Sequence, residues 1–249
     1  MAVNTDKNLY TVVFAAIMVV VVGSVLALTA SGLSDKIKEN QRFEKQQNIL
    51  YAMGVNENVD EGSVNFIPAD KVEAEFTKYI KEQLVIEDGK VLKDENAYLI
   101  DVKKQTTLAR KGEKAKLPLF IGDKDGKKFY IIPMYGKGLW DAIWGFIALD
   151  DKMVVQGVYF DHKGETPGLG ANIKQRYFMD DFTGESIMSG TKYSGISVAK
   201  GNNDPINARK DDNKVDALAG ATITGNGVSA MISETMKFYE DYLKTIRVN

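Results

Sequence analysis

Small and hydroxylated residues gather near the end of the chain, in the stretch from Asp216 to Val228. Residues of this size allow a backbone to approach a ligand closely. Apolar side chains follow at helical spacing, which predicts a helix from about Asn226 to Ile246. Thr222 and Thr224 then lie just before a helix N-terminus, where free N–H groups and the helix dipole stabilise a phosphate.

Other interpretations of this stretch stay open on the residues alone. Thr224 is equally suited to be the ordinary N-cap of a glycine-rich turn, and turns of this kind are common. The stretch is not a Walker loop, because no Gly-Lys-Ser/Thr follows it. It lies too near the C-terminus to open a dinucleotide-binding βαβ unit. Nothing in the residue types separates Thr222 from Thr224 as the carrier of a phosphate.

Two further segments have residues suited to a heteroaromatic ligand. The first is Gly138-Leu139-Trp140, where glycine exposes the backbone N–H groups and Trp140 offers a flat apolar surface. The second runs from Glu165 to Gly170, and its Glu165 and Thr166 could hydrogen-bond a ring or a sugar-like edge. The alternative is that Trp140 belongs to the core and that the second segment is only a turn.

Composition narrows the chemistry that this chain can perform. The 249 residues include no cysteine, which excludes disulfides and thiolate-bound clusters, and only one histidine, His162, which excludes a histidine-rich metal site. The net charge of −2 comes without a basic stripe, so we expect no nucleic-acid partner. We expect no metal and no catalytic residue, and any redox chemistry then requires an organic cofactor. His162 is interpreted as a hydrogen-bonding or surface residue.

An uncharged apolar run extends from Tyr10 to Ala30. About 20 helical residues cross the hydrocarbon core of a membrane, so residues 1–32 are predicted to form an N-terminal membrane anchor. A cleaved signal peptide is the alternative, with small residues near Ala27 to Ala30 as its processing site. The run is longer than a usual signal core and is preceded by little positive charge, which favours the anchor.

The rest of the chain predicts an α+β fold. Residues 33–54 form an amphipathic connecting helix that ends at Gly54, and residues 55–249 form a soluble domain with an antiparallel or mixed sheet. A Pro68-Ala69-Asp70 start predicts a helix from Val72 to Leu84. Strands are expected at Ala97–Val102, Leu117–Ile121, Lys128–Met134, Trp144–Leu149 and Met153–Phe160, the last two joined by a turn at Asp150-Asp151.

At Asp216 to Thr222 the sequence resembles the flavinylation motif Asp-x-x-Ser/Thr-Gly-Ala-Thr of the FMN-binding domain family. Asp216 matches the acidic position, Gly220 and Ala221 the small ones, and Thr222 the acceptor, while Ala219 departs from the usual Ser or Thr. The segments at residues 138–140 and 165–170 are similar to flavin-lining segments of that family. The family includes the C subunit of the sodium-translocating NADH:quinone oxidoreductase and the G subunit of the Rnf complex. The Gln-Asn-Ile-Leu helix and the Gly-Leu-Trp-Asp segment favour the former.

The resemblance implies one FMN, joined through its phosphate to Thr222 by an FAD:protein FMN transferase. It also implies electron relay within a multisubunit membrane complex that couples NADH-to-quinone electron transfer to sodium export. The expected cofactor-binding residues are those of the three segments, namely Thr222, Gly220, Ala221, Thr224, Gly138, Leu139, Trp140, Glu165, Thr166, Leu169 and Gly170.

Alternatives remain both for the side of the membrane on which the domain lies and for the function of the chain. Lysines and an arginine follow the apolar run, which by the positive-inside rule places the domain in the cytoplasm. The resemblance implies instead the periplasmic side of a bacterial inner membrane, and we prefer it because acidic residues are mixed among those charges. The competing functions are a G-type Rnf subunit, a non-redox membrane-tethered binding module, and a hydrolase that uses Thr222 or a nearby serine with His162.

Overall fold

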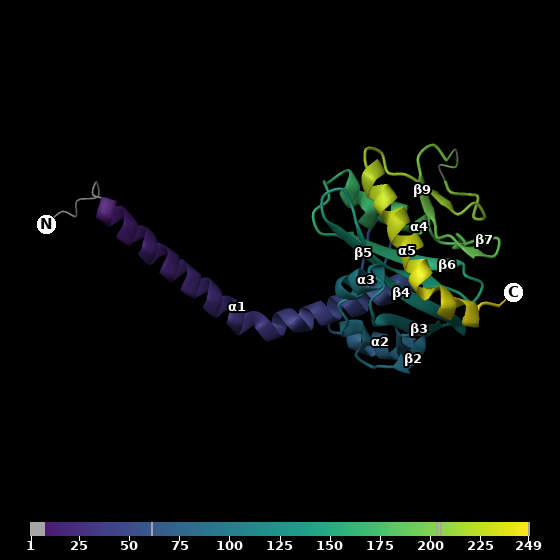
Figure 1. Ribbon diagram of the computed structural model, residues 1–249, viewed down its shortest axis with the longest axis horizontal. Helices are drawn as coiled ribbons and strands as arrows, with labels where there is room; N and C mark the ends of the chain where they lie inside the picture. The colour runs from purple at the N-terminus through teal and green to yellow at the C-terminus, as the bar shows by residue number, and fades with distance from the viewer. Residues whose placement is uncertain (1–7, 61, 203, 205, 249) are drawn as a thin grey trace. The chain divides into compact units, whose positions relative to one another are not determined.

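The computed structural model describes residues 8–60, 62–202, 204 and 206–248. The chain divides into two units, Met1–Arg42 and Phe43–Asn249. Helix α1 (Asn8–Ala52) makes up the described part of the first unit and enters the second. The second unit holds every other helix and strand that the described residues form, and it is coloured from blue to yellow in Figure 1.

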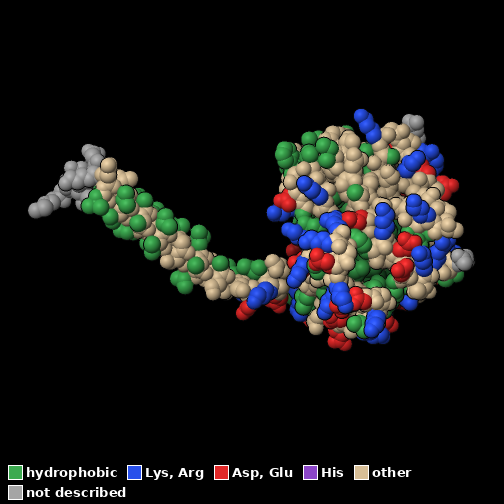
Figure 2. All heavy atoms as spheres, in the orientation of Figure 1, with side chains coloured by type: hydrophobic (Ala, Val, Ile, Leu, Met, Phe, Trp, Pro, Cys, Tyr) green, Lys and Arg blue, Asp and Glu red, His purple; other side chains and the backbone are tan. Residues whose placement is uncertain are grey.

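The first part of α1 carries its apolar side chains on the surface. No charged residue occurs between Asn8 and Ser34, and Figure 2 shows hydrophobic side chains along this stretch. Its valines, leucines and isoleucine are all exposed. Within the described part of the chain, α1 is the one helix long and apolar enough to cross a membrane. This length and composition fit the expected anchor.

The last turns of α1 belong to the core of the second unit. Gln46 and the residues from Asn48 to Ala52 are buried. The helix ends at Ala52, and Gly54, with a φ of 75° and an N–H bond to the Tyr51 carbonyl, terminates it. The helix expected over residues 33–54 is therefore continuous with the apolar run. The second unit begins at Phe43, so it includes part of the segment that was expected to form a connecting helix.

One antiparallel sheet of six strands organises the second unit, in the order β2-β1-β3-β4-β5-β6. These strands are β1 (Ile80–Glu87), β2 (Lys90–Lys93), β3 (Leu117–Lys124), β4 (Lys127–Lys137), β5 (Ala142–Leu149) and β6 (Val155–His162). The other elements are α2 (Val72–Tyr79), η1 (Ala97–Leu99), α3 (Val102–Arg110), η2 (Gly170–Lys174), α4 (Arg176–Asp180), β7 (Met188–Ser189), β8 (Lys192–Tyr193), β9 (Ser197–Ala199), β10 (Lys214–Asp216) and α5 (Thr222–Ile246).

The two faces of the sheet are covered by different helices. Gly122, which pairs with Phe129, lies so close to Met53 of the α1 end that a Cβ atom there would overlap its side chain. Gly136 lies equally close to Met231 of α5. Phe129 and Gly136 are an odd number of residues apart along β4, so they point to opposite faces. The sheet is therefore held between the end of α1 and α5, which crosses it in Figure 1.

The expected α+β class is confirmed: the sheet is antiparallel, strands β3 to β6 form a meander, and β1 lies between β2 and β3. Strands lie where we expected them at residues 117–121, 128–134 and 144–149, and the Asp150-Asp151 turn joins β5 to β6. From β3 to β6 each strand is followed by its neighbour in the sheet, so short connections join them, whereas the longer connection from β2 to β3 carries η1 and α3.

Two expected elements are wrong. The helix from Val72 to Leu84 ends at Tyr79, because the chain becomes extended at Ile80 and pairs as β1 with both β2 and β3. The strand over Ala97–Val102 is instead a single 3-10 turn followed by α3. The side chain of Asp101 accepts a hydrogen bond from the Lys104 N–H and so caps α3 at this point.

Candidate functional site

Helix α5 begins at Thr222, earlier than the expected Asn226. Gly220 has a φ of 71° and turns the chain, and the N–H of Gly225 then donates to the Ala221 carbonyl at 2.9 Å as the first helical bond. Thr222 and Thr224 therefore lie in the first turn of α5 and not before it. The apolar periodicity used for the prediction starts only at Val228, where the helix first reaches the core.

The start of α5 has no side-chain cap. Ala221 occupies the N-cap position, where its methyl side chain cannot accept a hydrogen bond, and no acidic residue lies in the first turn. The first N–H groups of a helix lack partners within the helix, and together with the helix dipole they favour an anion. Thr222, the first helical residue, is exposed at this place.

Thr224 differs from Thr222 in both burial and bonding. Its side chain is 1% exposed, and its hydroxyl donates to Oε2 of Glu165 at 2.5 Å. It is therefore not the N-cap that the alternative interpretation assumed. A buried hydroxyl that already donates to a carboxylate has no room for a phosphate. The structure thus distinguishes the two threonines, which the residue types did not.

Glu165 is the buried acid of this region, with 4% of its surface exposed. Its Oε1 accepts the N–H of Trp140 at 2.9 Å, and its own N–H donates to Nδ1 of His162 at 3.2 Å. Burial raises the pKa of Glu165, but the hydrogen bonds from the Thr224 hydroxyl and from the backbone N–H groups around Trp140 outweigh burial and lower it. Glu165 is therefore ionised at neutral pH.

Trp140 is not a core residue, because 66% of its surface is exposed. Its indole Nε1–H donates to Oγ1 of Thr166 at 3.1 Å, which holds the ring in one orientation. The carbonyl of Thr166 also accepts the N–H groups of Leu169 and Ala171, each at 3.1 Å. The loop after β6 is thereby folded against the loop between β4 and β5.

The glycines of the three segments mark their close contacts. A Cβ atom at Gly170 would lie 2.5 Å from both Oε2 of Glu165 and the Thr224 hydroxyl. A Cβ atom at Gly227 would overlap the carbonyl oxygen of Lys137. A Cβ atom at Gly220 would lie 2.7 Å from the side chain of Leu169. The segments at residues 138–140, 165–170 and 220–227 therefore meet at the start of α5.

An exposed apolar surface surrounds this meeting point. Figure 2 shows hydrophobic side chains gathered at the end of the domain where α5 begins. The exposed apolar residues of the three segments are Leu139, Trp140, Leu169 and Ile223. At its edge Lys163 forms an ion pair of 2.9 Å with Asp141, and this bond holds the pKa of the Asp141 carboxyl below its usual range. Such a surface beside an uncapped helix start, which favours an anion, suits a flat ring that carries a phosphate.

The geometry gives no support to a hydrolase. Within the described residues, no hydrogen bond joins His162 to a serine or threonine hydroxyl. Nδ1 of His162 accepts the Glu165 N–H, and its Nε2 is buried without a partner among the described residues. A general base must reach the hydroxyl that it activates.

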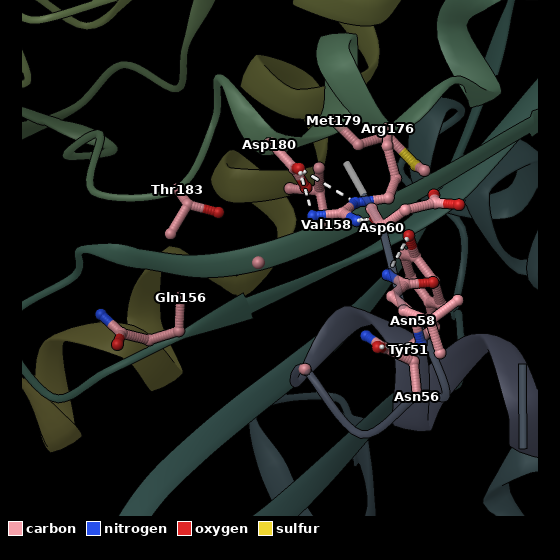
Figure 3. A pocket seen from close by; sticks show the side chains of 13 residues that line it. Tyr51, Asn56, Asn58, Asp60, Gln156, Val158, Arg176, Met179, Asp180 and Thr183 are labelled. Carbon is pink, nitrogen blue, oxygen red and sulfur yellow. Dashed lines mark hydrogen bonds and ion pairs between the residues drawn. The ribbon is translucent and has the colours of Figure 1, made fainter. Parts of the chain in front are cut away.

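A cavity of about 430 Å³ lies elsewhere and shares no residue with the three segments (Figure 3). Arg176 lines it, but its guanidinium already bonds the side chain of Asp180 and the carbonyl of Asp60. Tyr51 accepts a hydrogen bond from Asn58. Because these polar groups are paired with each other, we assign the cavity no ligand.

The remaining predicted residues lie around the same point. Asp216 ends β10, which pairs in parallel with β9, and the exposed Ala219 stands where the motif usually has a hydroxyl. Gly138 and Gly170 are buried against Glu165. Sequence reasoning missed the pairing of Thr224 with Glu165. The one signal for this pairing is the burial of Thr224 on the inner side of α5. Because the helix was expected to start at Asn226, Thr224 was not placed on that side.

These features define a flavin-binding fold, and comparison with known sequences agrees. The FMN-binding domain family matches residues 138–237, a range that contains all three segments. Two curated relatives are each 30% identical to this chain, and both carry the name of the C subunit of the Na(+)-translocating NADH-quinone reductase. The protein from Yersinia pestis aligns over 236 residues, 90% of this chain and 87% of its own. The protein from Vibrio anguillarum aligns over 245 residues, 92% and 90% respectively.

Solved structures lead to the same family. The crystal structure of the C subunit of this reductase from Parabacteroides distasonis has a TM-score of 0.70 and 30% identity, and covers 85% of this chain and 96% of its own. The structure of NqrC from Shewanella oneidensis has a TM-score of 0.64 and 25% identity, and covers 83% and 99%. The chain belongs to the family of the C subunit of the Na(+)-translocating NADH-quinone reductase. The expected family is thereby confirmed, and this identity favours the C subunit over a G-type Rnf subunit.

Proposed function

We propose that this chain is the flavoprotein subunit of a sodium-translocating NADH:quinone oxidoreductase, with one FMN joined through its phosphate to Thr222. In this role it relays electrons during NADH-to-quinone transfer that is coupled to sodium export. It works with the other subunits of a membrane complex, since one transmembrane helix cannot form an ion path. An FAD:protein FMN transferase attaches the cofactor during maturation.

The observation that carries this proposal is the position of Thr222. It is an exposed hydroxyl at the uncapped start of α5, beside a surface of exposed apolar side chains. The free N–H groups of the first turn would receive the phosphate oxygens, and no acidic side chain competes for them. Thr224, the neighbouring candidate, is buried and bonded to Glu165.

The residues of the chain would bind and orient the cofactor. A bound flavin supplies one- and two-electron chemistry, and the protein tunes it by hydrogen bonds and nearby charge. Trp140 and Leu169 provide apolar surface for the ring, and the indole is held by Thr166. Gly220 turns the chain so that Thr222 faces outward. The ester bond adds no redox chemistry but fixes where the cofactor sits.

The first unit supplies the membrane anchor in this proposal. We assign residues 1–32 to the anchor and 33–54 to a helix that leads into the domain of residues 55–249, with the last turns of α1 packed in its core. The domain lies on the periplasmic side of the bacterial inner membrane. Protease added to intact spheroplasts should cleave the domain, and full protection of the domain would contradict this orientation.

The attachment is tested by co-expressing the full chain with an FMN transferase. Wild type, Thr222→Ala and Thr224→Ser are compared by flavin fluorescence in denaturing gels and by intact mass. We expect covalent flavin in wild type and in Thr224→Ser, which keeps the hydroxyl, and none in Thr222→Ala. The proposal fails if wild type stays unmodified while the same transferase labels a control protein. It also fails if Thr222→Ala still carries the flavin.

A further inference from the structure

The loop between β4 and β5 directs its backbone donors inward. The N–H of Trp140 donates to Oε1 of Glu165 at 2.9 Å, and the N–H groups of Asp141 and Leu139 also lower the pKa of that carboxyl by hydrogen bonding. Consecutive N–H groups that converge on one anion form a nest. The anion that fills this nest is a side chain of the protein itself.

The second oxygen of the same carboxylate is committed to α5. Oε2 of Glu165 accepts the Thr224 hydroxyl at 2.5 Å. One side chain from the loop after β6 therefore bonds the β4–β5 loop through one oxygen and the first turn of α5 through the other. These are the three segments that meet at Thr222.

The space around the carboxylate excludes a ligand. A Cβ atom at Gly138 would lie 2.5 Å from Oε1, and one at Gly170 would lie 2.5 Å from Oε2. The backbone thus closes on both oxygens, and the residue is 4% exposed. Glu165 was predicted from sequence to contact the cofactor, and this packing assigns it a different role.

We propose that Glu165 is a positioning residue: its carboxylate clamps the nest at residues 139–141 to the first turn of α5, so that Leu139 and Trp140 face the cofactor while Glu165 does not touch it. This inference rests on the proposed function for the cofactor, but the clamp itself exists in the protein chain alone. Charge-assisted hydrogen bonds are roughly twice as strong as neutral ones, which makes an ionised Glu165 well suited to hold a loop.

The clamp is tested first by backbone hydrogen exchange on the full chain in detergent, before any flavin is attached. Glu165→Gln keeps the shape but removes the charge, and we expect exchange at residues 139–141 to rise about tenfold while β4 and β5 stay protected. Glu185→Gln is the matched control, since Glu185 is also a buried glutamate and lies outside the three segments. It should leave exchange at residues 139–141 unchanged.

A second variant separates the two halves of the clamp. Thr224→Val removes only the bond to Oε2, so exchange should rise in the first turn of α5 while residues 139–141 keep their protection. After loading with FMN by the transferase, Glu165→Gln should show lower anisotropy of the attached flavin than wild type. Unchanged exchange at residues 139–141 in Glu165→Gln overturns the clamp, and so does a uniform rise across the whole domain. If wild type takes up no flavin, the proposed function fails while the exchange result still decides the clamp.

Discussion

The hydroxyl of Thr224 donates to the carboxylate of Glu165 at 2.5 Å, although the two residues lie on different elements far apart in the sequence. Through this bond the inner side of the first α5 turn is occupied by a contact within the protein. The outer side, where Thr222 begins the helix, is left exposed. One contact thus assigns different roles to two threonines of the same turn.

Removing this bond should reduce stability. Thr224→Val keeps the side-chain shape but leaves the buried Glu165 carboxylate without one donor, so we predict a loss of about 1.5–3 kcal/mol in the free energy of unfolding. Thr235→Val is the control, because Thr235 is also buried and bonds only the Met231 carbonyl of its own helix, and it should cost about 1 kcal/mol or less. Equilibrium urea unfolding measures both. Equal losses in the two variants would argue against a special contribution from Glu165.

Two buried glutamates should respond to pH in opposite directions. The pKa of Glu165 lies below its usual value of 4.5, so its contribution to stability is present above pH 4.5 and is lost as the pH falls through its folded value. Burial raises the pKa of Glu185 and outweighs the hydrogen bond from Asn207, so stability is lost as the pH rises from 4.5 toward its folded value.

Stability profiles of wild type, Glu165→Gln and Glu185→Gln between acid and neutral pH test this pair. Relative to Glu165→Gln, wild type should gain stability as the pH rises. Relative to Glu185→Gln, wild type should lose stability as the pH rises. Two differences of the same sign would refute the assignment.

Gly227 provides a test of packing between α5 and the β4–β5 loop. Replacing a helical glycine by alanine usually stabilises a helix by about 1 kcal/mol. Here the added Cβ would overlap the Lys137 carbonyl, and such crowding costs about 1–3 kcal/mol, so Gly227→Ala should lower the thermal midpoint. Asn226→Ala, at an exposed position of the same turn, should leave the midpoint equal or slightly higher. A stabilised Gly227→Ala variant would show that the β4–β5 loop moves away from the added Cβ at little energetic cost.

The beginning of the folded domain can be located by truncation. A chain that starts at residue 40 should unfold cooperatively, whereas one that starts at residue 55 should not fold. The longer chain keeps Ile49, Leu50 and Met53, which are buried in the core. Losing such a side chain costs about 2–5 kcal/mol, and losing several exceeds a total stability of about 5–15 kcal/mol. Circular dichroism melts distinguish the cases, and a cooperative melt of the shorter chain would place the boundary at residue 55.

The sequence predicted secondary structure best where a segment follows a single pattern of apolar residues. Strands β3, β4 and β5 are short apolar runs between turns, and α5 repeats its apolar side chains at helical spacing, so these elements are confirmed. The failure at residues 97–102 has a local cause. Apolar residues there resemble a strand, yet Asp101 caps a helix and the chain follows the cap. The β1–β2 hairpin was not predicted, although Asp88-Gly89, both of which have a positive φ, is a pair typical of tight hairpin turns.

The sequence predicted which three segments form the site, but it did not predict how their residues contact one another. Glycines and Trp140 indicated that backbone donors and an aromatic ring gather around a ligand. The structure directs the donors of the β4–β5 loop to Glu165 and leaves the ring outside. Which acceptor receives a backbone N–H depends on contacts between distant segments, and neither spacing nor composition records such contacts.

Helix α5 has a mechanical consequence for anything attached to Thr222. The same helix that begins with this residue buries Val228, Met231, Ile232 and Met236 against the sheet. A group esterified at its first residue is therefore attached to a packed helix and not to a mobile loop, and only the bonds of the attached group and the Thr222 side chain can rotate. The point of attachment moves only with the domain, so a displacement larger than the length of the attached group requires the domain or the neighbouring redox centre to move.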